Sequence, residues 1–303
     1  MSDIRFDGRV AVITGAGGGL GKTYALELAR RGAAVVVNDL GGSADGRGGS
    51  SSMADATVKE INETGGKAVA NYDSVSTPEG GKAIVQTALD NFGKVDILVN
   101  NAGILRDKSF LKLEPKDLEA VLDVHLKGAF FVTQPAFASM KENGYGRIVM
   151  ASSGAGIFGN FGQSNYGAAK MGLVGLMNVL AVEGAKNNIK VNTIAPIAKT
   201  RLTEQLLGGM ADALDPTFVT PLVVYLCSEK CELSHEIFDV GGGRYARIFI
   251  GMTQGWITPK GKKPSADDIF DHIDVIRDAK SYTIPQSIAD ETAAIAQALK
   301  SQQ

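Results

Sequence analysis

The chain has 303 residues, of which 44% are hydrophobic, so it is long enough to bury one large core. Its 31 basic and 33 acidic residues nearly cancel, which argues against nucleic acid or an anionic membrane as a partner and favours a small-molecule substrate. No run of 18 apolar residues predicts a membrane-spanning helix, and the first residues lack the apolar segment of a signal peptide. These features predict a soluble, intracellular protein.

Short apolar runs rich in β-branched residues alternate along the chain with segments of helical period. The helical segments predict crossovers; residues 22–32, for example, have helical period and end on a glycine. This alternation predicts an α/β fold, a doubly wound parallel sheet of the Rossmann type in a single domain. The apolar runs predict strands buried on both faces, at residues 10–14, 34–39, 67–72, 96–102, 147–153, 189–196 and 237–242.

A glycine-rich turn, Thr14 to Gly21, follows the first predicted strand and precedes a helix. Glycines there let the chain turn sharply, and they bring backbone amides and the helix N-terminus to a dinucleotide pyrophosphate. Asp39 stands at the end of the second strand. A carboxylate there accepts hydrogen bonds from the adenosine ribose and repels a 2′-phosphate, so we expect NAD(H) in preference to NADP(H). The alternative is that Asp39 only caps the following turn.

Three residues in the middle of the chain predict an acid/base device. Tyr166 and Lys170 are four residues apart, so on a helix they share a face, and Ser153 precedes them at the end of a predicted strand. Oxidising a secondary alcohol removes a proton from oxygen while hydride leaves carbon, and a tyrosine pKa of about 10 is too high for this at neutral pH. Lys170 would favour tyrosinate through its positive charge, and Ser153 would hydrogen-bond the substrate oxygen. An isolated Tyr/Lys pair is more typical of a surface helix, so the interpretation as a nicotinamide-dependent oxidoreductase depends on the rest of the chain.

The cysteines are few and close together. Cys227 and Cys231 are the only two, which argues against a disulfide scaffold. With His235 they have the spacing of a metal-binding helical face, provided that one helix continues through all three. Ser234 and the strand-like residues after it indicate that the helix has already ended. We therefore expect buried thiols, a loop histidine and no metal ion.

Taken together, these motifs resemble a known family. Residues 14–21 (TGAGGGLG), 100–103 (NNAG), Ser153 and 166–170 (YGAAK) are similar to the short-chain dehydrogenase/reductase superfamily. Longer stretches, among them NNAGILRDKSF, VHLKGAFFVT and GIFGNFGQSNY, resemble the (3R)-hydroxyacyl-CoA dehydrogenase part of the peroxisomal multifunctional type 2 enzymes. That resemblance implies oxidation of a (3R)-hydroxyacyl-CoA by NAD⁺ in fatty-acid or steroid side-chain β-oxidation. The alternatives are a 17β-hydroxysteroid dehydrogenase acting on free steroid and a catalytically silent NAD(H)-binding scaffold.

The resemblance also implies roles for individual residues. Tyr166 is expected to be the catalytic acid/base, Ser153 the partner of the substrate oxygen, and Lys170 both the tuner of Tyr166 and a ligand of the nicotinamide ribose. His125 stands where the superfamily usually has asparagine, and it either relays protons through water or is a buried, hydrogen-bonded histidine. Besides Tyr166 and Lys170, the expected contacts to NAD are Gly15, Gly19, Leu20, Gly21, Asp39, Ser74, Val75, Asn101, Ala102, Gly103, Ile197, Ala198 and Thr200.

Two segments after the sixth strand bear on the substrate side. Ile197 follows Pro196 where the superfamily usually has glycine, so the turn there must be made without glycine's freedom. Residues 199–213 place apolar side chains, among them Leu202 and Leu206, at helical spacing and resemble the lid over the substrate. A plain core-facing helix is the alternative.

The superfamily usually ends near Gly243. Residues 1–243 are therefore expected to form the dehydrogenase domain, and residues 244–303 a C-terminal extension packed on the same domain or on a dimer partner. In that extension, Lys260, Lys262 and Lys263 either meet CoA phosphates or belong to a solvated loop.

Assembly and location follow from two further features. The helix of residues 166–186 carries more apolar residues than one core-facing stripe requires, which predicts a homodimer. The chain ends in Ser301, Gln302 and Gln303 rather than in a peroxisomal signal, which predicts a cytoplasmic enzyme.

Overall fold

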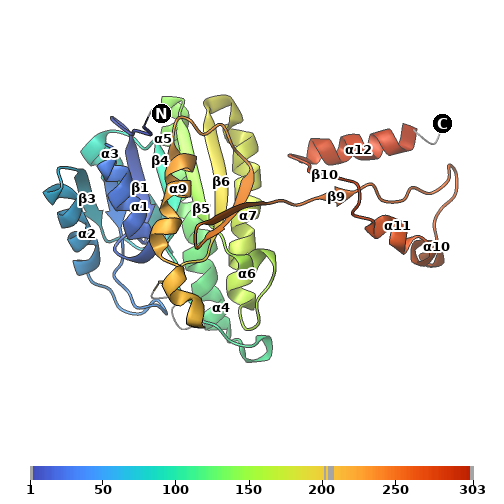
Figure 1. The fold of residues 1–303 in the computed structure, drawn as a ribbon, viewed down its shortest axis with the longest axis horizontal. Coiled ribbons are helices and arrows are strands. Elements are labelled where there is room, and N and C mark those ends of the chain that lie inside the picture. The colour runs from blue at the N-terminus through green and yellow to red at the C-terminus, as the bar shows by residue number, and fades with distance from the viewer. Residues whose placement is uncertain (1–2, 201–202, 204–207, 301–303) are drawn as a thin grey trace. The chain divides into compact units, whose positions relative to one another are not determined.

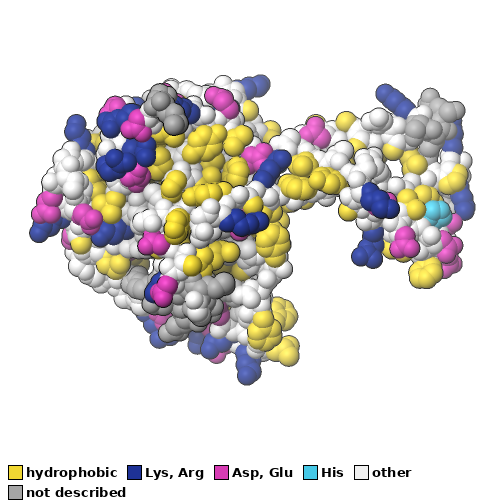
Figure 2. Space-filling view, viewed as in Figure 1, with side chains coloured by type: hydrophobic (Ala, Val, Ile, Leu, Met, Phe, Trp, Pro, Cys, Tyr) yellow, Lys and Arg dark blue, Asp and Glu magenta, His cyan; other side chains and the backbone are white. Residues whose placement is uncertain are grey.

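The structure is a computed structural model that describes residues 3–200, 203 and 208–300. The chain forms two compact units, residues 1–247 and residues 248–303 (Figure 1). The predicted boundary after Gly243 falls in the turn between two neighbouring strands, a few residues before the division between the units. Basic and acidic side chains mix over the face of the molecule shown in Figure 2, as expected from the nearly cancelled charges.

The first unit is built on an eight-stranded sheet with the order β3-β2-β1-β4-β5-β6-β7-β8 (Figure 1). Strands β1 to β7 pair in parallel. Only Gly242 and Gly243 separate β7 from β8, which is too short for a parallel crossover, so β8 runs antiparallel. The strands are β1 (Val10–Thr14), β2 (Ala34–Asn38), β3 (Lys67–Asn71), β4 (Ile97–Asn100), β5 (Gly146–Ala151), β6 (Ile189–Pro196), β7 (Glu236–Gly241) and β8 (Arg244–Ile248). The predicted doubly wound parallel sheet is confirmed.

The central strands are apolar because helices cover both of their faces. Every residue of β1, β4 and β5 is buried. Arg147 in β5 is the charged exception. Its guanidinium donates to the carbonyl oxygens of Ser228 (3.0 Å) and Asn188 (2.9 Å), so the buried charge is compensated by hydrogen bonds.

Alternate residues of each strand face different helices. Ile13, Val37 and Val99 join an apolar cluster with α1, α2 and α9, whereas α3, α5 and α7 contact the sheet outside that cluster. Helix ends follow the sequence: Thr77 accepts a hydrogen bond from the Gly80 amide at the start of α3, which ends on Gly93 in the left-handed conformation. The helices are α1 (Gly19–Arg30), α2 (Ser52–Glu63), α3 (Pro78–Phe92), α4 (Pro115–Leu122), α5 (Gly128–Asn143), α6 (Gly154–Ile157), α7 (Ser164–Gly184) and α9 (Thr220–Cys227).

Helix α7 is long and apolar enough to cross a membrane by length and composition alone. It packs against β5 and β6, and 44% of its most apolar window is buried inside the protein. A core helix of a soluble protein passes the same test, and the contacts of α7 are those of a core helix.

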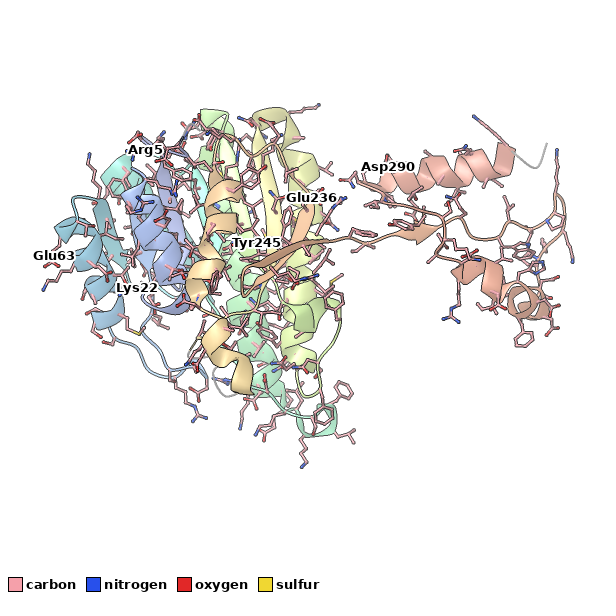
Figure 3. All side chains as sticks on the ribbon, in the orientation of Figure 1. Arg5, Lys22, Glu63, Glu236, Tyr245 and Asp290 are labelled. Carbon is pink, nitrogen blue, oxygen red and sulfur yellow. The ribbon has the colours of Figure 1, made fainter. Side chains whose placement is uncertain are left out.

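The edge strand β8 is tied to its neighbours by polar contacts. Arg247 forms an ion pair with Glu236 of β7, and the Tyr245 hydroxyl donates to the Phe218 carbonyl oxygen at 2.8 Å. Figure 3 labels Glu236 and Tyr245 on these two strands.

The second unit is small. Its strands β9 (Met252–Thr253) and β10 (Tyr282–Thr283) form an antiparallel pair, and Phe249 stacks on Tyr282 with ring centroids 5.4 Å apart. Its helices are α10 (Ala266–Asp271), α11 (Ile273–Arg277) and α12 (Ile288–Lys300). None of the helical residues described in this unit is buried within it.

Candidate active site

The glycine-rich turn joins β1 to α1. Gly15 and Gly19 have positive φ angles of 65° and 53°, a region that other residues rarely adopt. Gly21 is required for a different reason: a Cβ there would lie 2.2 Å from the Gly15 carbonyl oxygen. Leu20 is the second residue of α1, directly after Gly19. The turn therefore places a helix N-terminus without a side-chain cap at the end of β1, where backbone amides can bind an anion.

Asn101, directly after β4, holds this turn. Its backbone amide donates to Thr14 Oγ1 at 3.0 Å, and its side-chain amide donates to the carbonyl oxygens of Thr14 and Gly15 at 3.0 and 3.1 Å. The Ala102 amide also donates to Thr14 Oγ1, at 3.1 Å. The side chain of Asn101 thus positions the turn.

Asp39 lies directly after β2 and accepts two backbone hydrogen bonds. Its Oδ2 accepts from the Gly17 amide at 2.8 Å, and its Oδ1 accepts from the Gly41 amide at 2.7 Å. The carboxylate therefore both caps the turn after β2 and stands against the glycine-rich turn. An ionised carboxylate has about four acceptor positions, so two remain for ribose hydroxyls.

The other expected cofactor contacts lie at the same edge of the sheet. Ser74 and Val75 follow β3, and Val75 is buried next to Gly128. The Ile197 amide donates to the Val240 carbonyl oxygen at 2.8 Å, so the backbone pairing continues past β6. Glycine is required instead on the neighbouring strand, because a Cβ at Gly241 would lie 2.6 Å from the Ile197 carbonyl oxygen.

The chain after Ile197 returns to the glycine-rich turn. Ala198 is buried, and the side chain of Thr200 lies 3.6 Å from where a Cβ on Gly19 would stand. Of the expected lid, Leu202, Leu206 and Leu207 lie outside the described residues.

The structure brings Ser153, Tyr166 and Lys170 together. Ser153 follows β5 and caps α6, where its hydroxyl accepts from the Ala155 amide at 3.1 Å, and it lies close enough to the Tyr166 phenol to affect the pKa of that group. Tyr166 and Lys170 lie one turn apart on α7, with Lys170 Nζ 5.5 Å from the Tyr166 ring centroid. Lys170 is buried, and its ammonium donates to the Ala151 carbonyl oxygen.

The protonation of this group is governed mainly by burial. Burial lowers the pKa of Lys170 to about 7, so its charge changes near neutral pH. Burial raises the pKa of Tyr166, and the nearby Ser153 hydroxyl opposes that rise. The net direction differs from the sequence expectation of a favoured tyrosinate, because desolvation of the phenol outweighs the groups that stabilise its charged form.

His125 lies beside Tyr166, with the two rings edge to face and their centroids 5.1 Å apart. It stands on a π-helical turn, Asp123–Lys127, that links α4 to α5. Gly103 is required here, because a Cβ there would lie 2.5 Å from His125 Cε1. Burial and the charge of Lys170 lower the pKa of His125, so its ring is neutral.

The two ring nitrogens of His125 differ in their contacts. Nε2 lies 3.0 Å from the Ile104 amide and 2.8 Å from the Ile104 carbonyl oxygen, as expected for a buried, hydrogen-bonded histidine. Nδ1 has no hydrogen-bond partner among the described residues. A cavity of about 10 Å³, which is about the size of one water molecule, is lined by His125, Lys170 and Thr14. The cavity has room for the water molecule through which Nδ1 of His125 would relay protons.

Asp107 is a residue that the sequence analysis did not single out. Gln163, which directly precedes α7, donates to Asp107 Oδ2 at 2.7 Å, and the Lys108 amide donates to the Gly162 carbonyl oxygen at 2.9 Å. Two loops are thereby joined beside the catalytic helix. The negative charge of Asp107 contributes to the raised pKa of Tyr166. Its place within NNAGILRDKSF was the only signal in the sequence.

The cysteines do not form a metal site with His235. Helix α9 ends at Cys227, so Cys231 and His235 do not continue its face. Both thiols are free and buried, and burial raises their pKa values. Among the residues that the structure describes, no group of three or more His, Cys, Asp or Glu could hold a metal ion.

A protein-family model described as short chain dehydrogenase matches residues 9–208 of the chain. The chain belongs to the short-chain dehydrogenase family. This dehydrogenase is 51% identical over 300 residues to peroxisomal multifunctional enzyme type 2 of Mus musculus, which covers 98% of the chain and 40% of that relative. It is 53% identical over 262 residues to a short-chain type dehydrogenase/reductase of Mycobacterium tuberculosis, covering 86% of the chain and 91% of that relative. The mouse relative has a peroxisomal name, and a cytoplasmic location of this chain stays a prediction.

Solved structures are also similar. Full-length peroxisomal multifunctional enzyme type 2 from Drosophila melanogaster has a TM-score of 0.82 at 40% identity, covering 98% of this chain and 50% of that one. A 7α-hydroxysteroid dehydrogenase complexed with NADH and 7-oxo glycochenodeoxycholic acid has a TM-score of 0.72 at 30% identity, covering 80% of this chain and 98% of that one. The dehydrogenase therefore uses a nicotinamide cofactor, and the open helix N-terminus at Gly19 fits its pyrophosphate.

The charge of Asp107 predicts a pH effect. Asp107→Asn removes the charge and keeps an oxygen that can accept from Gln163, so the pKa of Tyr166 should fall. The rising limb of log kcat/KM for alcohol oxidation should then move to lower pH, and the shift should shrink in high salt because Asp107 is on the surface.

Gln163→Ala is the matched control, since it breaks the hydrogen bond that Asp107→Asn keeps and keeps the charge that Asp107→Asn removes. In Gln163→Ala, the rising limb of log kcat/KM should not move to lower pH. Equal shifts in the two variants would contradict the charge of Asp107 as the cause of the effect on Tyr166.

Proposed function

We propose that this dehydrogenase oxidises (3R)-hydroxyacyl-CoA to 3-ketoacyl-CoA with NAD⁺. The observation that carries the proposal is the arrangement of Ser153, Tyr166 and Lys170 at the carboxyl edge of the sheet, where β5 ends and α7 begins. The identity of 51% with the mouse multifunctional enzyme, over nearly the whole chain, supports the substrate class.

The residues of the chain would divide the work as follows. Tyr166 accepts the proton of the 3-hydroxyl group as hydride leaves C3 for the nicotinamide, so the alcohol becomes a ketone and NAD⁺ becomes NADH. Ser153 donates a hydrogen bond to the same oxygen and fixes its orientation. Lys170, whose pKa is about 7, stabilises tyrosinate when it is protonated.

A CoA ester suits this site better than a free alcohol. Contacts to the distant part of a CoA substrate can be used to align the 3-hydroxyl group with Tyr166, and a small alcohol lacks those contacts. Free steroid is the second candidate, because the similar 7α-hydroxysteroid dehydrogenase structure holds a steroid.

The first test compares substrates. We expect NADH formation from (3R)-hydroxyacyl-CoA esters, with a steep fall in kcat/KM when the same acyl group lacks CoA, and little reaction with the (3S) esters. Tyr166→Phe should lower kcat by at least about 100-fold and leave NADH binding almost unchanged. Equal efficiency with a free 17β-hydroxysteroid would favour the steroid function. Tight NADH binding with neither reaction would favour a silent binding protein.

Cofactor choice is proposed to depend on Asp39. Asp39→Ala removes the acceptor for the ribose hydroxyls and the repulsion of a 2′-phosphate, so the ratio of kcat/KM for NAD⁺ over NADP⁺ should fall by about tenfold or more. Asp39→Asn is the matched variant, because it loses the charge and keeps an acceptor for the Gly17 amide. An unchanged ratio in both variants would mean that Asp39 only caps its turn.

We further propose a homodimer that pairs α7 with its copy. Met171, Val179 and Val182 are 37%, 55% and 56% exposed and lie on the same face as Gly175, where a Cβ would meet no atom within 4 Å. The opposite face of α7, with Leu173, Val174 and Met177, is already buried in the core. A second apolar face on one helix favours a two-fold partner.

Sedimentation tests this assembly. The wild-type chain should sediment as a dimer at micromolar concentration, and Val179→Glu should sediment as a monomer because two carboxylates would be buried across the two-fold axis. Val179→Ala should remain dimeric. A monomeric wild-type chain would contradict the proposal.

A further inference from the structure

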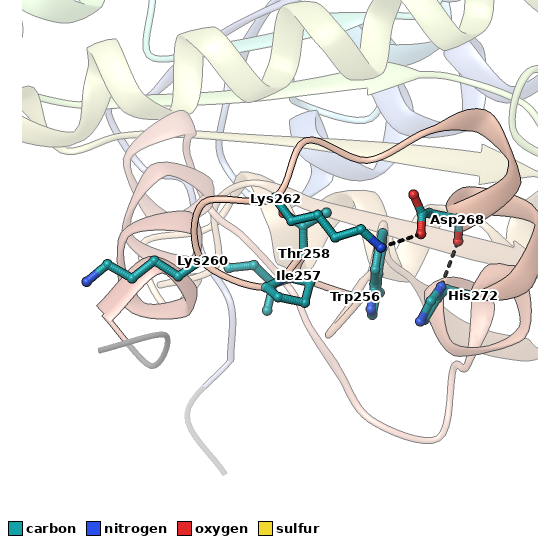
Figure 4. A pocket seen from close by; sticks show the side chains of 8 residues that line it. Trp256, Ile257, Thr258, Lys260, Lys262, Asp268 and His272 are labelled. Atoms are coloured by element: carbon teal, nitrogen blue, oxygen red, sulfur yellow. Dashed lines mark hydrogen bonds and ion pairs between the residues drawn. The ribbon is translucent and has the colours of Figure 1, made fainter.

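The second unit contains a pocket of about 480 Å³ between the loop after β9 and the helices α10 and α11 (Figure 4). Lys262 forms an ion pair with Asp268 there at 3.0 Å, and Trp256 stacks on His272 with ring centroids 3.9 Å apart. These contacts already satisfy both pairs of groups. A loop of the first unit bears more directly on the cofactor.

Residues 40–50, which we call the strap, form the loop between β2 and α2, drawn in blue in Figure 1. The Ser50 amide donates to the Leu40 carbonyl oxygen at 2.9 Å, so the two ends of the strap lie together. Directly before it, Asp39 accepts from the Gly17 amide at 2.8 Å. The base of the strap therefore stands against the glycine-rich turn.

The tip of the strap is tied to the segment that follows β4. The Leu105 amide donates to the Ala44 carbonyl oxygen at 3.0 Å, and Nε of Arg106 donates to the Asp45 carbonyl oxygen at 3.0 Å. In the sheet, β1 lies between β2 and β4. The strap therefore crosses the carboxyl end of β1, where the strand order reverses and a crevice for a dinucleotide forms.

The segment that holds the tip is itself fixed to the catalytic helix. Asn165, in the first turn of α7, is fully buried; its side-chain amide donates to the Arg106 carbonyl oxygen at 3.0 Å, and its Oδ1 accepts from the Tyr166 amide at 2.8 Å. The Arg106 guanidinium also pairs with Asp117 of α4 at 3.4 Å. Arg106 thus joins the strap to the helix that carries Tyr166.

The two sides of this contact differ in their freedom to move. Residues 41–52 hold five glycines and four serines, so the backbone of the strap has many conformations open to it, whereas the segment after β4 is fixed by buried hydrogen bonds. We propose that Arg106 is a positioning residue that holds the strap closed across the crevice, and that opening of the strap sets the rates at which NAD(H) enters and leaves. This role rests on the cofactor site proposed above.

Stopped-flow measurement of NADH fluorescence tests the strap. Arg106→Met keeps the apolar stem of the side chain and removes its hydrogen-bond donors, so NADH should dissociate at least about fivefold faster. Association should become faster as well, because the cofactor no longer waits for the strap to open. General damage to the cofactor site would instead slow association, and that result would overturn the proposal.

Arg47→Met is the matched control. Arg47 lies on the strap with its side chain 81% exposed, and it pairs with Asp45 within the strap. The substitution removes the same type of side chain without touching the segment after β4, so both NADH rates should stay unchanged. Equal acceleration in the two variants would show that the contact of Arg106 with the strap does not control the cofactor.

Two glycines of the strap provide a second pair of variants that leaves Arg106 in place. Gly46 and Gly48 have positive φ angles of 83° and 71°, so alanine strains the backbone at either position. A Cβ on Gly46 would lie 3.0 Å from Ile104 Cγ2, whereas one on Gly48 would meet no atom within 4 Å. Gly46→Ala should therefore accelerate both NADH rates at least about threefold more than Gly48→Ala. Equal effects would contradict a strap held by the segment after β4.

Trypsin provides a readout that needs no activity, because Arg47 is an exposed cleavage site on the strap. Without cofactor, Arg106→Met should be cut after Arg47 faster than the wild-type chain, and NADH should protect the wild-type strap. Equal cleavage of the two chains would overturn the role of Arg106. If the chain binds NADH but oxidises no hydroxyacyl-CoA, the proposed function fails, and the NADH rates and the cleavage still decide whether the strap gates the cofactor.

Discussion

The hydrogen bonds between Thr14 and Asn101 hold together the two strands on which the rest of the site depends. In the sheet order, the chain runs from β1 toward one edge and from β4 toward the other, so the two strands flank the point where the strand order reverses. Crevices form at that point in open α/β sheets, because the crossovers on its two sides lie on opposite faces. With Gly15 and Gly21 allowing close approach, this link fixes the cofactor turn relative to the segment that leads to Gly103 and His125.

The catalytic group illustrates a balance between desolvation and charge. Burial favours the neutral forms of both Tyr166 and Lys170, and it does so in opposite pKa directions. The ammonium group of Lys170 therefore titrates near neutral pH, whereas the phenol of Tyr166 stays protonated there. Because a protonated phenol cannot accept a proton, alcohol oxidation by the proposed route requires Tyr166 to ionise first. Ser153 is the group that lowers the pKa of Tyr166 directly.

Local patterns determined much of this protein. The sequence predicted the seven parallel strands, the glycine-rich turn and the shared helix face of Tyr166 and Lys170. Each of these depends on residues that are close in sequence and on the regular repeat of a strand or a helix. The end of the helix before His235 was predictable for the same reason, and in the structure α9 ends at Cys227.

Only the tertiary structure decided which distant residues meet. The contact of Asp107 with Gln163 and that of His125 with Ile104 join segments that no local pattern connects. The direction of the Tyr166 pKa was likewise decided by burial, which the motif does not encode. Spacing along the chain sets which side chains share an element, but desolvation and long-range hydrogen bonds depend on how the elements pack.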